Sequence, residues 1–92
     1  VGELASRHLK RVTLELGGKN STIVLDDADL EVAASSAAWG AYLHQGQICM
    51  ATGRVLVPEK LAKAFIDKLA EKADHLPVGD PFRNQVALGP LI

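Results

Sequence analysis

A single thiol and a glycine-flanked carboxylate give this sequence its strongest potential for covalent chemistry. Cys49 is the only cysteine among the 92 residues. A cysteine thiolate acts as a nucleophile where a base, a cation or a helix N-terminus lowers the pKa of the thiol from about 8.5. A lone cysteine is also a common small apolar core residue, so the residue type alone leaves both interpretations open.

Glu15 is the second candidate, because it stands just before Gly17 and Gly18. Glycines without a Cβ atom let a ligand or another backbone come close to the carboxylate. A partly buried carboxylate at this place can act as a general base, whereas the plainer interpretation is a solvated strand residue. Spacing along the chain does not by itself bring Glu15 and Cys49 together.

The remaining reactive side chains form weaker patterns. His44 lies five residues before Cys49, so a Cys–His pair like that of cysteine hydrolases is an alternative to a surface histidine. The histidines and the cysteine lack zinc-ligand spacing, and the acidic run 26–29 lacks the alternating ligands and the central glycine of a calcium loop. We therefore expect no metal site, and we expect Asp29 to cap the helix that follows it.

The composition limits the class of protein. Hydrophobic residues make up 48% of the chain, the net charge is -1 and the pI is near 6.3. These values predict a folded core, and no basic patch with interleaved aromatics points to a nucleic-acid partner. No apolar run reaches the roughly 20 residues of a membrane span, and a single cysteine favours a reducing, cytoplasmic location. The start at Val1 shows no signal-peptide pattern. The missing Met start and the abrupt end at Leu91–Ile92 suggest a piece of a longer protein.

Strand and helix patterns alternate along the chain. Apolar alternation and short apolar runs predict strands, and apolar spacing of three to four residues predicts helices. The predicted elements are a helix tail over Val1–Leu9, strands over Arg11–Leu16 and Ser21–Leu25, a helix over Leu30–Leu43, a strand over Gly53–Val57 and a helix over Glu59–Leu76. This order indicates an α/β fold. Gly40 inside a predicted helix indicates close contact with another element.

Five short motifs, in order, resemble those of the aldehyde dehydrogenase superfamily. Leu14–Lys19 is similar to the glutamate motif of that family. Gly46–Cys49 with Arg54 is similar to its cysteine motif, and the two candidate residues have the family's separation of 34 positions. The other three matches are Val24–Leu30, Gly79–Pro81 and Gly89–Ile92. The resemblance covers essentially the whole chain and makes Cys49 the expected nucleophile.

This resemblance implies a fragment of an aldehyde dehydrogenase-like α/β fold. Residues 1–18 would be the C-terminal end of the Rossmann-like, NAD(P)-binding domain, and residues 19–92 the N-terminal part of the catalytic domain. The resemblance also implies NAD or NADP as cofactor, a small-molecule aldehyde as substrate, and a parent enzyme that is a homodimer or homotetramer. Because the family's phosphate grip and one oxyanion donor belong to an upstream region, the isolated chain is expected to be inactive.

The family mechanism, carried over residue by residue, gives five positions a role. Cys49 would attack the aldehyde carbon, and hydride transfer from the resulting thiohemiacetal would leave a thioester. The Cys49 backbone N–H would form half of an oxyanion hole, and Glu15 would activate the water that hydrolyses the thioester. The Leu16 carbonyl and Gly17 would lie against the nicotinamide, and Gly2 resembles the end of the family's phosphate-binding segment.

The stretch Trp39–Met50 is most similar to the benzaldehyde and vanillin dehydrogenase branch of the family. Trp39, Tyr42 and Leu43 would shape an apolar pocket for an aromatic aldehyde, or Trp39 and Tyr42 would simply pack in the core. A dehydrogenase that passes the acyl group to coenzyme A is an alternative, but Glu15 argues against it because that carboxylate serves water activation. A non-catalytic truncated module is the third hypothesis.

Overall fold

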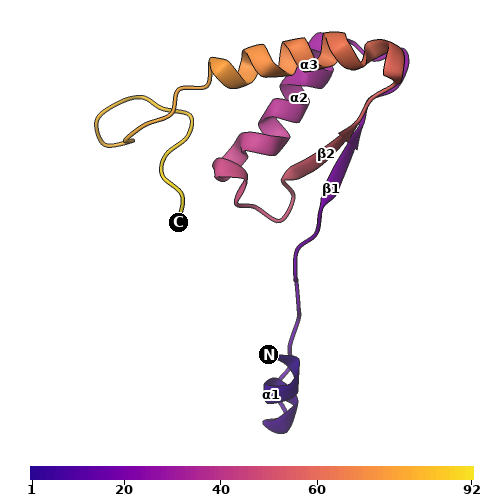
Figure 1. The fold of residues 1–92 in the computed structure, drawn as a ribbon. Coiled ribbons are helices and arrows are strands. Elements are labelled where there is room, and N and C mark those ends of the chain that lie inside the picture. Colours follow the sequence, from indigo (N-terminus) through magenta and orange to yellow (C-terminus); the bar gives the residue numbers. More distant parts are fainter.

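The body of the chain consists of two helices packed against a short parallel sheet (Figure 1). The computed structural model describes residues 1–92. The elements are, in chain order, α1 (Gly2–Arg7), β1 (Asn20–Ile23), α2 (Leu30–Tyr42), the 3-10 helix η1 (Leu43–Gly46), β2 (Thr52–Leu56) and α3 (Glu59–Asp74). The predicted helices and the second and third predicted strands are confirmed, with ends that differ by at most about two residues.

β1 and β2 pair in parallel, and the chain crosses from one to the other through α2. The pairing aligns Asn20 with Thr52 and Ser21 with Arg54, so Gly53 falls at an irregularity between them. Parallel strands need a long crossover, usually a helix, which is why the strand–helix–strand order pointed to this sheet. Since both strands start at the same edge, the segments that precede them are brought to one end of the sheet.

A small apolar cluster holds the helices to the sheet. Val24 directly after β1, Ala34 and Ala37 on α2, and Phe65 on α3 are buried together. The small alanine side chains let α3 come close to α2, and the Phe65 ring fills the space that remains. Because full burial of a phenylalanine side chain is worth roughly 1.5–3 kcal/mol, Phe65 is expected to contribute most to this cluster.

Gly40 marks a close approach of α2 to the sheet. A Cβ atom at this position would lie 2.5 Å from Thr52 Oγ1 and 3.4 Å from Thr52 Cβ. The structure thus confirms the contact predicted from a glycine inside a helix, where glycine costs about 1 kcal/mol relative to alanine. α2 is thereby seated directly on the first residue of β2.

Two polar interactions fix the start of α2. Asp29 caps the helix as predicted, since its Oδ1 accepts hydrogen bonds from the N–H groups of Glu31 at 2.8 Å and Val32 at 3.1 Å. The Glu31 carboxylate also binds the ammonium groups of Lys72 and Lys68 on α3, the latter at 2.9 Å. Hydrogen bonds from these two lysines, Lys72 first, lower the pKa of Glu31 to about 2.

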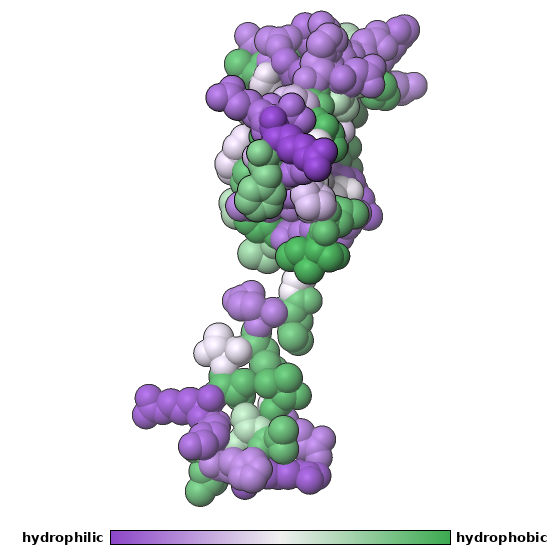
Figure 2. All heavy atoms as spheres, turned by 90° about the vertical axis from the view of Figure 1, so that its left-hand side faces the viewer, coloured by the Kyte–Doolittle hydropathy of each residue, from purple (hydrophilic) through white to green (hydrophobic).

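An N-terminal arm projects from this body. α1 and the extended residues 10–19 lie apart from the other elements (Figure 1), and the radius of gyration is 18.0 Å, against about 12 Å for a compact chain of this length. Hydrophobic side chains lie on the surface of the arm (Figure 2), where Leu9 is 95% and Leu16 86% exposed. None of the helices, however, combines the length and the hydrophobicity that crossing a bilayer requires.

The strand predicted over Arg11–Leu16 is wrong for this chain. The segment is extended, but no other segment forms backbone hydrogen bonds with it, and a strand exists only as part of a ladder. Val12 and Leu14 stay 43% and 48% exposed because their apolar face has no surface to pack on. The alternating pattern therefore predicted the local backbone conformation correctly and the pairing incorrectly.

The residues after α3 fold back on themselves in an irregular loop, as predicted. Val78 and Leu88 form an isolated parallel bridge, in which the Gly79 N–H donates to the Leu88 carbonyl at 3.1 Å. This loop returns Gly89–Ile92 to the segment that follows α2.

Substituting Gly40→Ala is expected to destabilise the full-length protein by about 1–3 kcal/mol, although alanine favours a helix. The reason is that the new methyl group would overlap Thr52 Oγ1 and push α2 away from β2. Urea unfolding followed by circular dichroism measures the loss. The double variant Gly40→Ala, Thr52→Ala should recover part of it, and a single variant as stable as the wild type would contradict the contact.

Glu31→Gln is expected to reduce the dependence of stability on pH in acid. The folded pKa of Glu31, about 2, lies below its ordinary value of 4.5. The ion pairs therefore contribute stability that is fully present above pH 4.5 and is lost as the pH falls toward 2. The difference between the urea unfolding midpoints at about pH 7 and about pH 3 should be smaller in Glu31→Gln than in the wild type. Glu59→Gln, in the first turn of α3 and without an ion pair, is the matched control and should behave like the wild type.

Candidate active site

Cys49 lies in an exposed turn shortly before β2. The turn covers Ile48–Ala51 and is closed by a hydrogen bond of 3.0 Å from the Ala51 N–H to the Ile48 carbonyl. The thiol is therefore not a core side chain in this structure, and it has the access that a nucleophile needs.

A left-handed bend leads from α2 into this turn. His44, Gln45 and Gly46 have φ angles of 50°, 58° and 72°. Glycine adopts this conformation without steric cost, whereas His44 and Gln45 must be held in it by surrounding contacts. No hydrogen bond joins His44 to Cys49, so the structure gives no support to the Cys–His pair of a hydrolase.

Asn20, at the start of β1, binds the cysteine turn directly. Its Nδ2 group donates to the carbonyl oxygens of Cys49 at 2.6 Å and of Ala51 at 3.2 Å. One side-chain amide thus satisfies two backbone acceptors of the turn. Sequence patterns alone assigned no role to Asn20, whose only signal was its place between a glycine-rich segment and a predicted strand.

The C-terminal segment holds the bend from another direction. Gln45 Nε2 donates to the Pro90 carbonyl at 3.3 Å, and Gln47 Oε1 accepts a hydrogen bond from the Ile92 N–H at 3.1 Å. Both contacts join residues 45 positions apart, so no local pattern could have predicted them. The Gly89–Ile92 motif therefore supports the loop that carries Cys49.

Glu15 lies exposed on the arm, five residues before β1 begins at Asn20. The expected position at the end of a strand is not realised, since residues 11–16 form none. Because Asn20 pairs in parallel with Thr52, the segments that carry Glu15 and Cys49 reach the same edge of the sheet. At most about 17 Å of extended chain separates Glu15 from Asn20. No hydrogen bond joins Glu15 to Cys49, and neither residue lines a cavity.

The residues expected to meet a nicotinamide lie in open space. Gly17 has a φ of +82°, and a Cβ atom at Gly17 or Gly18 would meet nothing within 4 Å. Leu16 is 86% exposed, and its carbonyl accepts no hydrogen bond within the chain. This bare backbone fits the approach of a flat ring with an amide substituent. Gly2 begins α1, where a Cβ atom would touch Leu14 Cδ1 at 3.6 Å.

Trp39, Tyr42 and Leu43 line one cavity of about 310 Å³ at the C-terminal end of α2. Leu76 and Leu88, from the region after α3, close the same cavity from the other side. Trp39 is 60% exposed, so burial in the core does not account for its presence. The three side chains therefore gather in a pocket, beside the bend that leads to Cys49.

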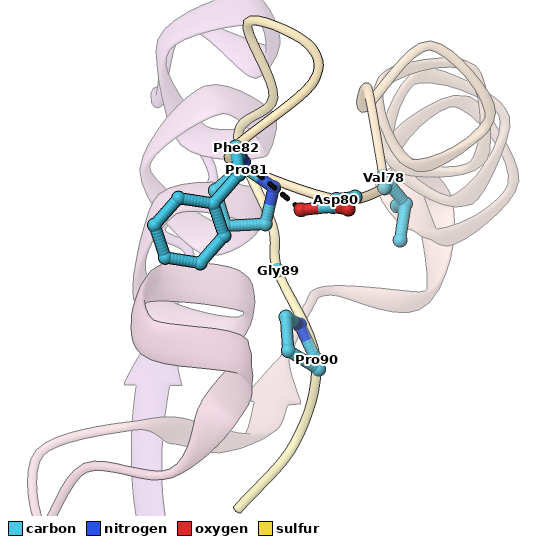
Figure 3. A pocket seen from close by; sticks show the side chains of 7 residues that line it. Val78, Asp80, Pro81, Phe82, Gly89 and Pro90 are labelled. Carbon is cyan, nitrogen blue, oxygen red and sulfur yellow. Dashed lines mark hydrogen bonds between the residues drawn. The ribbon is translucent and has the colours of Figure 1, made fainter.

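A second cavity, of about 470 Å³, lies within the loop after α3 (Figure 3). Its lining consists of turn residues: Val78, Gly79, Asp80, Pro81, Phe82, Gly89 and Pro90. The Asp80 carboxylate is already engaged, since Oδ1 accepts from the Phe82 N–H at 2.9 Å and Oδ2 lies 3.3 Å from Arg83 Nε. Without a nucleophile or a free base, this cavity is not the candidate active site.

Comparison with known proteins identifies the family. The sequence pattern of the aldehyde dehydrogenase family matches residues 1–92. The chain belongs to the aldehyde dehydrogenase family. Among its relatives, the vanillin dehydrogenase of an Amycolatopsis species is 66% identical, and the benzaldehyde dehydrogenase [NAD(+)] of Pseudomonas putida is 60% identical, both over 92 residues.

This aldehyde dehydrogenase chain is matched over its whole length but spans only 19% of each of those two relatives. The crystal structure of lactaldehyde dehydrogenase from Escherichia coli is similar to it with a TM-score of 0.92 and 36% identity, over 99% of this chain and 19% of the other. The projecting arm is therefore part of the family's architecture, and the chain is a small α/β segment of the aldehyde dehydrogenase fold. The family predicted from the motifs is confirmed.

Proposed function

We propose that residues 1–92 supply the nucleophile and the water-activating base of an NAD- or NADP-dependent aldehyde dehydrogenase that oxidises aromatic aldehydes to carboxylic acids. The parallel register of β1 and β2 carries this proposal, because through it the exposed Cys49 turn and the segment with Glu15 share one sheet edge. Family membership and the similarity to vanillin and benzaldehyde dehydrogenases support the reaction and the substrate class. The activity is proposed for the full-length protein.

Cys49 opens the proposed reaction as a thiolate. Its sulfur bonds to the aldehyde carbon, and the resulting oxyanion accepts a hydrogen bond from the Cys49 N–H. Leu16 and Gly17 would hold the nicotinamide of NAD or NADP, which would supply the hydride acceptor needed to convert the Cys49 adduct into a thioester. Glu15 then takes a proton from water, the water oxygen bonds to the thioester carbon, and the carbon–sulfur bond breaks to release the acid and the thiolate.

Two free backbone groups support these roles. The Cys49 N–H donates no hydrogen bond within the chain, so it is available to an oxyanion. The Leu16 carbonyl is equally free, and the open space at Gly17 would admit the nicotinamide ring. We assign these residues, with Gly2 toward the phosphates, to cofactor binding.

We assign residues 1–18 to the end of the cofactor-binding domain and residues 19–92 to the start of the catalytic domain. The change from arm to body supports this boundary, because β1 begins at Asn20. Only 5 of the 92 residues are buried, so we expect residues 1–92 alone to be inactive. The full-length enzyme is therefore the form in which this function can be measured.

The cavity beside α2 supports an aromatic substrate. Trp39 and Tyr42 line it, and contact between aromatic rings is worth about 0.5–1.5 kcal/mol beyond the area that it buries. Leu43 adds an aliphatic wall. An aryl aldehyde would therefore bind better here than a short aliphatic one.

Glu15→Gln is expected to separate the two half-reactions. Acylation of Cys49 and one round of NADH formation should proceed, whereas thioester hydrolysis should slow about 10²- to 10⁴-fold because the attacking water loses its base. Rapid mixing with NAD and benzaldehyde should show a burst of NADH followed by slow turnover. Mass spectrometry should detect the acyl group on Cys49, and Cys49→Ala should abolish both burst and adduct.

The outcome of this experiment separates the hypotheses. Glu59→Gln, an exposed carboxylate variant on α3, should turn over like the wild type. Turnover by Cys49→Ala would overturn the proposal, and wild-type hydrolysis rates in Glu15→Gln would remove Glu15 from the mechanism. Acyl-CoA formation on addition of coenzyme A would favour the acyl-transfer alternative.

Trp39→Ala is expected to raise the KM for benzaldehyde about 10-fold and to change the KM for acetaldehyde less than about twofold. The reason is that only the aryl substrate loses a ring contact. Steady-state kinetics with both aldehydes measure the difference, with Ile66→Ala, 61% exposed on α3, as control. Equal losses for both aldehydes, together with a lower melting temperature, would show that Trp39 serves packing instead.

A further inference from the structure

Asn20 links the strand that follows Glu15 to the turn that carries Cys49. Its Nδ2 atom lies 2.6 Å from the Cys49 carbonyl oxygen and 3.2 Å from that of Ala51. No other side chain of the chain hydrogen-bonds to residues 48–51. Apart from the backbone hydrogen bond from the Ala51 N–H to the Ile48 carbonyl, which closes the turn, the Asn20 amide is the contact that orients the Cys49–Met50 peptide.

The backbone ladder alone does not fix this turn. Pairing of β1 with β2 is irregular between Asn20 and Ser21, so Gly53 is skipped and regular pairing begins only with Ser21 and Arg54. The turn lies beyond this irregularity, where ladder hydrogen bonds no longer constrain it. The two donor hydrogens of the Asn20 amide take over that task, one for each carbonyl.

We propose that Asn20 is a positioning residue for the Cys49 nucleophile. By fixing the position of the Cys49 carbonyl, the Asn20 amide restricts rotation about the backbone bonds of Cys49. It thereby sets the direction of the Cys49 sulfur and of the backbone N–H that the substrate oxygen meets. Displacement of a reacting group by about 1 Å can cost about 100-fold in rate. The inference rests on the proposed role of Cys49 as nucleophile.

A merely structural role for Asn20 can be separated from this one. Thr22 Oγ1 and Thr52 Oγ1 are hydrogen-bonded at 3.1 Å, so Thr22→Val weakens the same pair of strands without touching Cys49. Asn84 is exposed and its side chain makes no hydrogen bond. It provides an asparagine control remote from the turn.

The first measurement compares Asn20→Ala, Asn20→Ser, Thr22→Val and Asn84→Ala in the full-length enzyme with NAD and benzaldehyde. Asn20→Ala is expected to lower kcat about 10- to 100-fold while KM stays within about threefold. Asn20→Ser, which keeps one donor, should recover part of kcat. Thr22→Val should lower the melting temperature, because it loses the hydrogen bond to Thr52, but keep kcat within about twofold, and Asn84→Ala should match the wild type.

A second measurement does not depend on aldehyde turnover. Asn20→Asp puts a carboxylate in place of the amide that contacts the Cys49 carbonyl, and a nearby negative charge disfavours the thiolate. The pH midpoint of Cys49 alkylation by iodoacetamide, followed on the Cys49 peptide by mass spectrometry, should rise by about 0.5 unit or more relative to Asn84→Asp.

Wild-type kcat in Asn20→Ala, or an equal fall of kcat in Thr22→Val, would overturn the positioning role. An unchanged alkylation midpoint in Asn20→Asp would overturn the contact itself. If Asn20→Ala fails to fold, Asn20→Ser and Asn20→Asp decide by the same criteria. A wild-type enzyme that oxidises no aldehyde would refute the proposed function, and the alkylation measurement would then decide separately whether Asn20 acts on Cys49.

Discussion

Parallel pairing of β1 with β2 is the constraint on which the candidate site depends. Strands that run in the same direction start at the same edge, so the segments before them meet there. In this chain the register of Asn20 with Thr52 brings the end of the arm that joins β1 to the same edge of the sheet as the cysteine turn. A shift by one residue would turn every side chain of β2 to the opposite face and would also take the turn away from the Asn20 amide.

The small residues of the crossover helix make this arrangement sterically possible. Gly40 lets α2 lie on Thr52, and Ala34 and Ala37 leave room for Phe65 of α3. Because α2 is seated on the start of β2, the chain needs only a short left-handed bend over residues 44–46 to reach the cysteine turn. Packing and the position of the thiol are thus connected, since the contacts that build the core also determine where Cys49 emerges.

The arm shows how an element can be well defined without a core of its own. The lactaldehyde dehydrogenase structure aligns with 99% of this chain, which includes the extended backbone of the arm. Leu9 and Leu16 on the arm are nevertheless almost fully exposed. Exposed hydrophobic side chains of this kind call for a covering surface. The curated relatives, of which this chain spans 19%, have many further residues from which such a surface can be built.

Local sequence determined the local features of this protein. The helix periodicities, the Asp29 cap, the small residue at Gly40 and the motifs around Glu15 and Cys49 all depend on residues close together in the chain, and each could be predicted, as could the family. The tertiary structure alone decided that Arg11–Leu16 has no strand partner here, that Asn20 binds the Cys49 carbonyl 29 positions away, and that Gln45 reaches Pro90 across 45 positions. The physical reason is that a hydrogen bond between distant segments depends on how the chain returns to itself, and a local pattern holds no information about its distant partner.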